Sequence, residues 1–176
     1  MRLKPPKFIR WLMPDLIWEM KDRSAVYLTF DDGPTPGITE WILSTLDKYD
    51  AKATFFVLGK NAEMYPDLYR RILDAGHRIG NHTYSHQKGW GMSLERYIED
   101  VDFANDLLHT ELFRPPYARI TPAQARALGK RYKLVMWDVL SRDYNRALSP
   151  RTCLRNVTRY LEGGSIVVFH DSEKSF

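Results

Sequence analysis

The stretch TFDDGP, residues 29–34, places two adjacent carboxylates at the end of an apolar run, residues 25–30. The run has the length and composition of a buried strand, and the glycine and proline that follow end it and turn the chain. Neighbouring residues on a strand point to opposite faces, but at a strand end both side chains can face one cleft. We therefore expect Asp31 and Asp32 to share one site.

Two carboxylates held this close do not both stay ionised without a compensating charge. If one of them binds a cation, the other can act as a base near neutral pH. The competing interpretation is a solvated turn, because Asp-Gly pairs are common there. The sequence must supply further ligands if the first interpretation is to hold.

Such ligands are present in HTYSH, residues 82–86, where two imidazoles lie four residues apart. His82 and His86 can reach one ion if the segment is helical or tightly looped. Two histidines and one aspartate leave a coordination position open, which is typical of catalytic rather than structural zinc sites. The spacing alone also fits a structural pair of histidines.

Five short blocks of the chain match one known family in order. Together they resemble the polysaccharide deacetylase family, the NodB-homology domain of metal-dependent carbohydrate esterases, over residues 25–171. The blocks are TFDDGP (29–34), HTYSH (82–86), RPPY (114–117), WDVLSRDY (137–144) and VFH (168–170).

The resemblance implies a divalent metal ion, most often zinc, held by Asp32, His82 and His86. This donor set does not by itself choose among zinc, cobalt, nickel and iron. The resemblance also implies that Asp31 is the base that takes a proton from the attacking water and that His170 is the acid that protonates the leaving amine.

Three further roles follow from the same resemblance. The backbone N–H of Tyr117 would stabilise the oxyanion together with the metal. Asp143 would hold Arg114, which in turn would orient Asp31. Hydroxyl groups between the two histidines, on Thr83 and Ser85, would fix the metal ligands by hydrogen bonds.

Other polar and aromatic residues receive simpler expectations. His77 is expected to be structural, His109 to end a helix, and Asp138 to be either a supporting acid or a strand-end residue. Sugar stacking is expected of Trp90 and Tyr117, in loops beside the motifs. Core positions are expected for Trp41, Phe55, Phe56 and Phe103.

Two features depart from the family pattern. Tyr144 stands where the fourth block commonly has tryptophan, which bears on the pocket and on the substrate. The chain ends at Phe176, six residues after His170, so we expect the strand and helix that normally close the fold to be missing.

The composition predicts one domain with a sizeable core. The chain has 176 residues, of which 44% are hydrophobic and 27% charged, and its single cysteine, Cys153, excludes an internal disulfide. The net charge of +4 is spread along the chain, which favours a basic solvated surface over a dedicated anionic partner. No motif indicates nucleic-acid binding, and none indicates an oligomeric state.

Residues 1–24 differ from the rest and predict an N-terminal arm before a catalytic domain, residues 25–176. The apolar run at Trp11 is too short for a signal peptide or a transmembrane helix, so no compartment is assigned. We expect the arm to pack on the domain through Trp11 and residues 16–18. A helix lying on a membrane surface is the less favoured alternative.

Strand-like and helical patterns alternate along the body, which predicts parallel βα units. An apolar face after Ser93, for example, predicts a helix. The motif blocks follow strand ends, where β/α barrels build their sites. Spacing alone leaves barrel and open sheet undecided, and the resemblance implies a distorted, incomplete β/α barrel. The expected strands are 25–30, 53–58, 77–79, 111–113, 133–139 and 165–169.

The sequence thus predicts a metal-dependent hydrolase that removes the N-acetyl group of an amino sugar, with an N-acetylated glycan as its partner. One alternative is an amidase of the same fold that acts on another acyl group or a non-sugar amide. The other is a non-catalytic glycan-binding module on a degenerate enzyme fold.

Overall fold

The structure is a computed structural model that describes residue 5 and residues 7–175. Within this part of the chain, the strands pair side by side in parallel and form one curled sheet. The strands are β1 (Tyr27–Asp31), β2 (Thr54–Val57), β3 (Arg78–Asn81), β4 (Leu112–Phe113), β5 (Lys133–Leu134), β6 (Val139–Leu140) and β7 (Ile166–His170).

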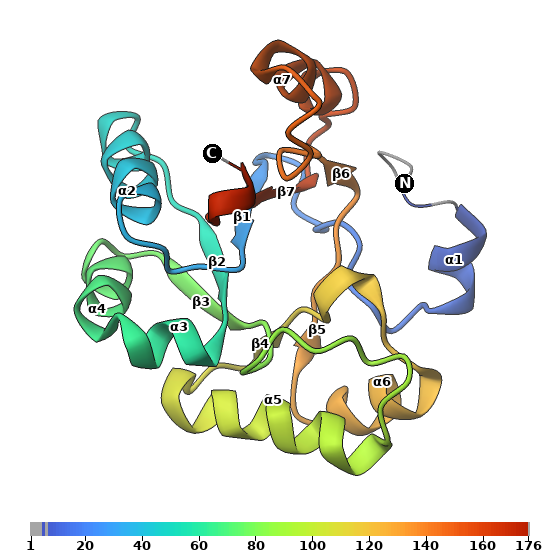
Figure 1. Ribbon diagram of the computed structural model, residues 1–176. Coiled ribbons are helices and arrows are strands. Elements are labelled where there is room, and N and C mark those ends of the chain that lie inside the picture. Colours follow the sequence, from blue (N-terminus) through green and yellow to red (C-terminus); the bar gives the residue numbers. More distant parts are fainter. Residues whose placement is uncertain (1–4, 6, 176) are drawn as a thin grey trace.

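The order across the sheet is β5-β4-β3-β2-β1-β7-β6, with β2 at its centre and β1 beside it. The strands curl around a common axis, and the helices lie outside them (Figure 1). In register, Asp31 of β1 lies beside His170 of β7 and Phe56 of β2. Because every pair is parallel, the carboxyl ends of the strands meet at one rim.

The helices follow the strands, as the alternating pattern predicted. Helix α5 begins after Ser93, whose side chain accepts a hydrogen bond from the Arg96 N–H, and it buries Tyr97 and Val101 against the sheet. The expected helix after Ser93 is therefore confirmed. The helices are α1 (Lys7–Leu12), α2 (Ile38–Lys48), α3 (Gly59–Met64), α4 (Pro66–Asp74), α5 (Leu94–Leu108), α6 (Pro122–Leu128) and α7 (Pro150–Thr158), with short 3-10 turns η1 (Pro116–Ala118) and η2 (Glu173–Ser175).

The expected single strand 133–139 is wrong, because the chain breaks between β5 and β6. Its first part pairs with β4, and its second part pairs with β7 on the other side of the sheet. In the break, the Arg114 guanidinium donates hydrogen bonds to two backbone carbonyls, from Nε to Val135 at 3.1 Å and from Nη2 to Met136 at 2.9 Å. The bend brings the two edges of the sheet toward each other and gives the incomplete barrel that was expected.

The N-terminal arm fills part of the remaining seam. Ile17 forms a parallel bridge with Val135, and Glu19 forms an antiparallel bridge with Ser165 before β7. Burial of Trp18 confirms the expected packing of residues 16–18, but Trp11 is 79% exposed and does not pack on the domain. Residues 1–4 and 6 of the expected arm lie outside the described residues. Among the helices of the described part, none is both long and apolar enough to cross a bilayer.

Two of the four aromatic side chains expected in the core lie on the surface instead. Phe55 and Phe56 of β2 are buried, as predicted, whereas Trp41 and Phe103 are 57% and 53% exposed. On α2 the buried face consists of residues such as Ile42, and Trp41 lies off that face. Apolar character alone therefore did not identify which helix face is buried.

Candidate metal and catalytic site

The predicted site residues gather at the carboxyl rim of the sheet, although they come from five parts of the chain. Asp31 ends β1, and Asp32 follows it with a left-handed backbone, φ 84°. This conformation turns both carboxylates toward one site, since His82 Nε2 lies 3.9 Å from Asp31 Oδ2 and 3.6 Å from Asp32 Oδ1. The shared site expected for the two aspartates is confirmed.

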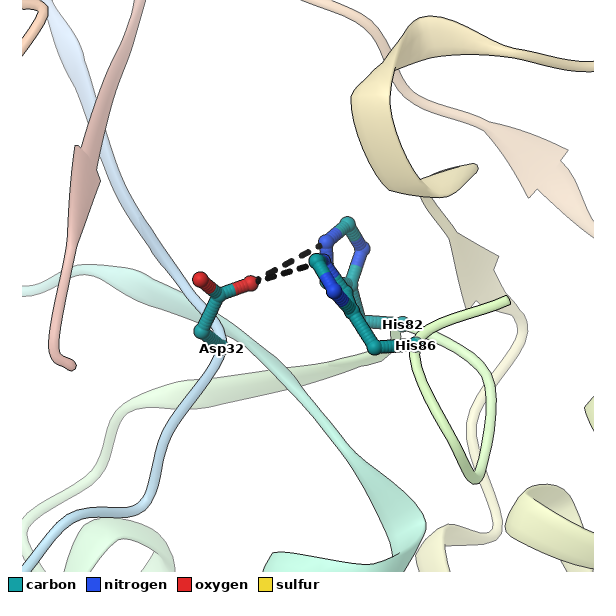
Figure 2. A group of neighbouring side chains, drawn as sticks. All are labelled: Asp32, His82 and His86. Atoms are coloured by element: carbon teal, nitrogen blue, oxygen red, sulfur yellow. Dashed lines mark ion pairs between the residues drawn. The ribbon is translucent and has the colours of Figure 1, made fainter. Parts of the chain in front are cut away.

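Asp32, His82 and His86 bring one ligand atom each to within 4.8 Å of one another. Figure 2 shows the Asp32 carboxylate directed at the two imidazoles, which lie side by side. The Nε2 atoms of His86 and His82 lie 3.0 and 3.6 Å from Asp32 Oδ1. The segment carrying the histidines is a tight loop, with positive φ at Thr83 and His86.

The protonation states of this triad suit a cation. Burial by itself raises the pKa of Asp32, but the neighbouring His86, His82 and His170 outweigh it and lower that pKa below its usual range. Burial lowers the pKa of His82 to about 4, against the opposing charges of Asp31 and Asp32. At neutral pH the site therefore offers an ionised carboxylate and a neutral imidazole, the forms that bind metals.

Polar contacts at Nδ1 also orient the two imidazole rings. His82 Nδ1 lies 2.7 Å from the carbonyl oxygen of Arg114, so Nδ1–H donates to this carbonyl and Nε2 keeps its lone pair. His86 Nδ1 lies 3.1 Å from the Tyr117 hydroxyl. Asp32 Oδ1 is buried and has no hydrogen-bond partner among the described residues. This buried acceptor beside two imidazoles fits a divalent ion with Asp, His, His ligation.

The loop between the two histidines is held by residues that the sequence analysis missed. Asp100 of α5 accepts the backbone N–H groups of Tyr84 and Ser85 and the Ser85 hydroxyl at 2.6 Å. Asn81 accepts the Thr83 N–H at 2.8 Å. The hydroxyls of Thr83 and Ser85 support the loop that carries the ligands and do not contact the imidazoles: the Ser85 hydroxyl donates to Asp100 of α5, and the Thr83 hydroxyl accepts the Gln87 N–H.

Arg114 is wholly buried inside the sheet and holds Asp31, as expected. Its Nη1 lies 2.6 Å from Asp31 Oδ1 and 2.8 Å from the Thr29 hydroxyl. Its guanidinium carbon also lies 3.9 Å from the centre of the Phe56 ring. With its other N–H groups on two backbone carbonyls, Arg114 fixes one carboxylate oxygen of Asp31 and leaves the other toward the triad.

Asp143 does not hold Arg114, and this expected contact is wrong. Instead, Asp143 accepts the backbone N–H of His170 at 2.7 Å and lies 2.8 Å from His170 Nδ1. The reason is topological, because Asp143 follows β6, the neighbour of β7, whose last residue is His170. Burial by itself lowers the pKa of His170, but the hydrogen bond and charge of Asp143 outweigh it and raise this pKa.

A second unexpected contact ties the aspartate loop to β7. Asp171 is buried and accepts the Gly33 N–H at 2.9 Å and the Thr39 hydroxyl at 2.8 Å. A Cβ atom at residue 33 would collide with the Asp171 carboxylate, so only glycine fits there. Asp171 therefore fixes the turn that follows Asp32.

A cleft of about 320 Å³ opens over these residues. Tyr117 lies in its wall, as expected of a sugar-stacking residue, and so does Tyr144, whose ring meets His170 edge-on with centroids 5.2 Å apart. Trp90 is not part of this wall; its indole N–H donates to the carbonyl of Ile120. The expectation that Trp90 contacts a sugar therefore finds no support in the cleft.

The residues given simpler expectations behave accordingly. His77 is buried and its Nδ1 accepts the Ala53 N–H, so it is structural. His109 follows the last turn of α5 in a left-handed conformation. Asp138 is buried and accepts the Ser165 hydroxyl and the Ile166 N–H, away from the metal ligands, which makes it a strand-end residue.

The fold and the site define a class of protein: a β/α barrel with a candidate three-ligand metal site, Asp32, His82 and His86, at its carboxyl rim. Comparison with protein families gives the particular family. The profile named polysaccharide deacetylase matches residues 19–137, so the chain belongs to the polysaccharide deacetylase family.

Relatives of this chain carry related names. A peptidoglycan-N-acetylglucosamine deacetylase of Bacillus cereus is 36% identical over 158 residues, which cover 86% of this chain and 57% of that protein. Chitin deacetylase 1 of Saccharomyces cerevisiae is 39% identical over 124 residues, 66% of this chain and 40% of that protein. The chain thus spans only part of each of these two relatives.

The crystal structure of the Bc1960 peptidoglycan N-acetylglucosamine deacetylase shares the fold. It superposes with a TM-score of 0.87 at 31% identity, over 94% of this chain and 80% of that chain. The incomplete barrel is therefore an architecture shared with a solved relative.

Proposed function

We propose that this protein hydrolyses the N-acetyl group of an amino sugar in a glycan and that it uses a divalent metal ion, zinc by family resemblance. The observation that carries the proposal is that the two adjacent carboxylates have different partners. Asp32 faces both imidazoles, whereas Asp31 is bound through one oxygen by the buried Arg114. One carboxylate is placed to bind a metal and the other to act as a base.

Asp32, His82 and His86 would hold the ion. When bound, zinc would polarise the acetyl carbonyl and acidify water at the site. A three-ligand set with mixed nitrogen and oxygen donors leaves room for water and substrate.

Asp31 is suited to take a proton from the attacking water. Arg114 donates to Oδ1, and Thr29 accepts a second hydrogen bond from the same guanidinium nitrogen. Oδ2 lies on the side of the triad, 3.9 Å from His82 Nε2. Arg114 therefore acts as a positioning residue for Asp31.

His170 is suited to give a proton to the nitrogen of the scissile amide. His170 lines the cleft, and Asp143 raises its pKa, so that it stays protonated to higher pH. The C–N bond breaks as this proton arrives, and one water is consumed to yield acetate and the free amine. Tyr117 lines the cleft, and by family resemblance its backbone N–H would stabilise the oxyanion.

The proposal is tested by acetate release from chitopentaose, with zinc-loaded protein beside a chelated sample. We expect acetate only from the loaded protein and its return when zinc is restored. Zinc binding without acetate release would contradict the proposal and favour another amide as substrate. Failure to bind any divalent metal would favour the non-catalytic glycan-binding module.

A further inference from the structure

Helix α1 presents two large aromatic side chains to solvent. Phe8 is 62% exposed and Trp11 is 79% exposed. They lie three residues apart on the helix, so they share one face of it. Helix α1 stands at the edge of the molecule, across the barrel from α2 and α4 (Figure 1). The two rings therefore form an apolar face that points away from the body of the domain.

The chain just after α1 is held firmly to the domain. Trp18 is buried, and its indole N–H donates to the carbonyl oxygen of Met13 at 3.2 Å. Arg10 Nη1 lies 3.3 Å from the carboxylate of Glu19. These contacts tie the end of α1 to the packed part of the arm, while Phe8 and Trp11 stay exposed.

The excess of positive charge lies in the same segment. The chain has 26 lysines and arginines and 22 aspartates and glutamates, and residues 1–12 contain four of the former and none of the latter. Residues 13–176 therefore hold 22 of each and are balanced. Basic residues occur along the whole chain, but their excess over acidic residues belongs to residues 1–12. The four cations are Arg2, Lys4, Lys7 and Arg10.

Basic side chains continue from the arm onto α6. A hollow of about 620 Å³ between residues 13–17 and α6 is lined by three cations and one carboxylate. They are Arg126, Lys130, Lys133 and Asp15. Lys133 already pairs with Glu111 at 2.7 Å. A second hollow beside the arm is balanced, with two cations and two carboxylates in its lining, so the excess charge is concentrated at α1 itself.

Aromatic rings beside lysine and arginine are typical of helices that lie in the interface of a bilayer. A soluble polyanion would pair with the cations but leave the rings in water. An uncharged apolar partner would cover the rings but leave the cations without counter-charges. An anionic bilayer satisfies both groups. The sequence favoured packing of Trp11 on the domain, and its exposure favours the membrane-surface alternative instead.

We propose that α1 docks on an anionic lipid bilayer, with Phe8 and Trp11 in the interface and the basic side chains of residues 1–12 against the headgroups. Among the described residues that line the cleft over the metal ligands, none belongs to α1. The cleft therefore stays open when the arm is bound, and docking requires neither the metal nor the proposed activity.

The test is sedimentation of the 176-residue protein with vesicles of phosphatidylcholine alone or of phosphatidylcholine mixed with phosphatidylglycerol. We expect binding to the mixed vesicles to be about tenfold or more tighter at low salt, with the difference decreasing at high salt. Equal binding to the two kinds of vesicle, or no binding to either, would overturn the proposal.

Trp11→Ala should weaken binding to the mixed vesicles about tenfold, because the ring no longer enters the interface. Trp41→Ala is the matched control, since Trp41 is an exposed tryptophan on α2, across the barrel. Quenching of fluorescence by lipids with brominated acyl chains should be lost in Trp11→Ala and retained in Trp41→Ala. Equal binding by the two variants would overturn the proposal. Phe8→Ala, at the same face, should repeat the loss.

The charge contribution is tested separately. Lys4→Gln with Lys7→Gln should weaken binding about tenfold or more, because each cation near an anionic surface strengthens binding about fivefold. Lys48→Gln with Lys52→Gln removes the same charge from exposed positions near the end of α2 and should change binding less than about twofold. Equal losses in the two double variants would contradict docking through α1.

Two other occupants of this face give distinct results. Concentration-dependent dimers that are lost in Trp11→Ala, without vesicle binding, would overturn the proposal in favour of a second copy of the chain. Binding of polyphosphate that is equal in the wild-type protein and in Trp11→Ala, without vesicle binding, would overturn it in favour of a soluble polyanion. Thermal unfolding should be unchanged in Phe8→Ala and Trp11→Ala, because both rings are exposed.

Discussion

The carboxylate of Asp143 contacts His170 twice, through the backbone N–H at 2.7 Å and through ring Nδ1 at 2.8 Å. The first contact fixes the end of β7, and the second orients the imidazole and stabilises its protonated form. One residue therefore sets both the position and the acidity of the group that we propose as the acid.

The pH dependence of turnover follows from this pair. Because Asp143 raises the pKa of His170, the protonated acid persists to higher pH, and activity should fall as pH rises through that pKa. Asp143→Asn removes the charge, so the alkaline limb of the kcat/KM profile should move to lower pH by about one unit or more. An unmoved limb would separate His170 from the rate-limiting proton transfer.

Arg114 is expected to be important for stability as well as for catalysis. Arg114→Met would leave Asp31 buried without its partner, which typically costs about 3–5 kcal/mol of the free energy of unfolding. Arg131→Met is the control, because the Arg131–Asp102 pair has a similar distance, 2.9 Å, but lies at the surface, and it should cost under about 1 kcal/mol. Urea unfolding of the chelated proteins measures both, and equal losses would contradict the prediction.

Asp100 should affect metal affinity without touching the metal. Asp100→Ala removes the acceptor of the loop that carries His82 and His86, and loss of such supporting contacts typically weakens binding by about tenfold or more. Competition with a chromophoric chelator measures the zinc dissociation constant. Glu99→Ala, at an exposed neighbour on α5, should leave it unchanged; a similar loss in both variants would argue against a specific role for Asp100.

The backbone at Ala118 predicts a stabilising substitution. Ala118 has φ 56°, in the left-handed region where a Cβ is unfavourable and glycine is not. Ala118→Gly should raise the free energy of unfolding by about 0.5–1 kcal/mol, after the larger entropy of the unfolded chain is subtracted. Ala75→Gly, at an ordinary φ of −73°, should lower it. Thermal unfolding of both variants checks the sign.

The sequence was sufficient for the parts of the site that lie within short motifs. Asp31 with Asp32, and His82 with His86, are close along the chain and follow strands, so their chemistry could be recognised without coordinates. The parallel β/α alternation was visible for the same reason, because strand and helix patterns are local.

Contacts between distant segments could not be read in this way. The pairing of Asp143 with His170 depends on β6 lying beside β7, and the break in residues 133–139 depends on the curl of the whole sheet. Asp100 lies on a helix outside every motif, and only its position beneath the histidine loop gives it a role. The exposure of Trp41 likewise depends on which face of α2 meets the sheet.

The most direct test of the division of labour between the adjacent aspartates is zinc stoichiometry and acetate release measured together on Asp31→Asn. We predict one zinc per chain, as in the wild-type protein, with acetate release from chitopentaose abolished, whereas His82→Ala should lose both. Turnover retained in Asp31→Asn would remove Asp31 from the role of base and contradict the account.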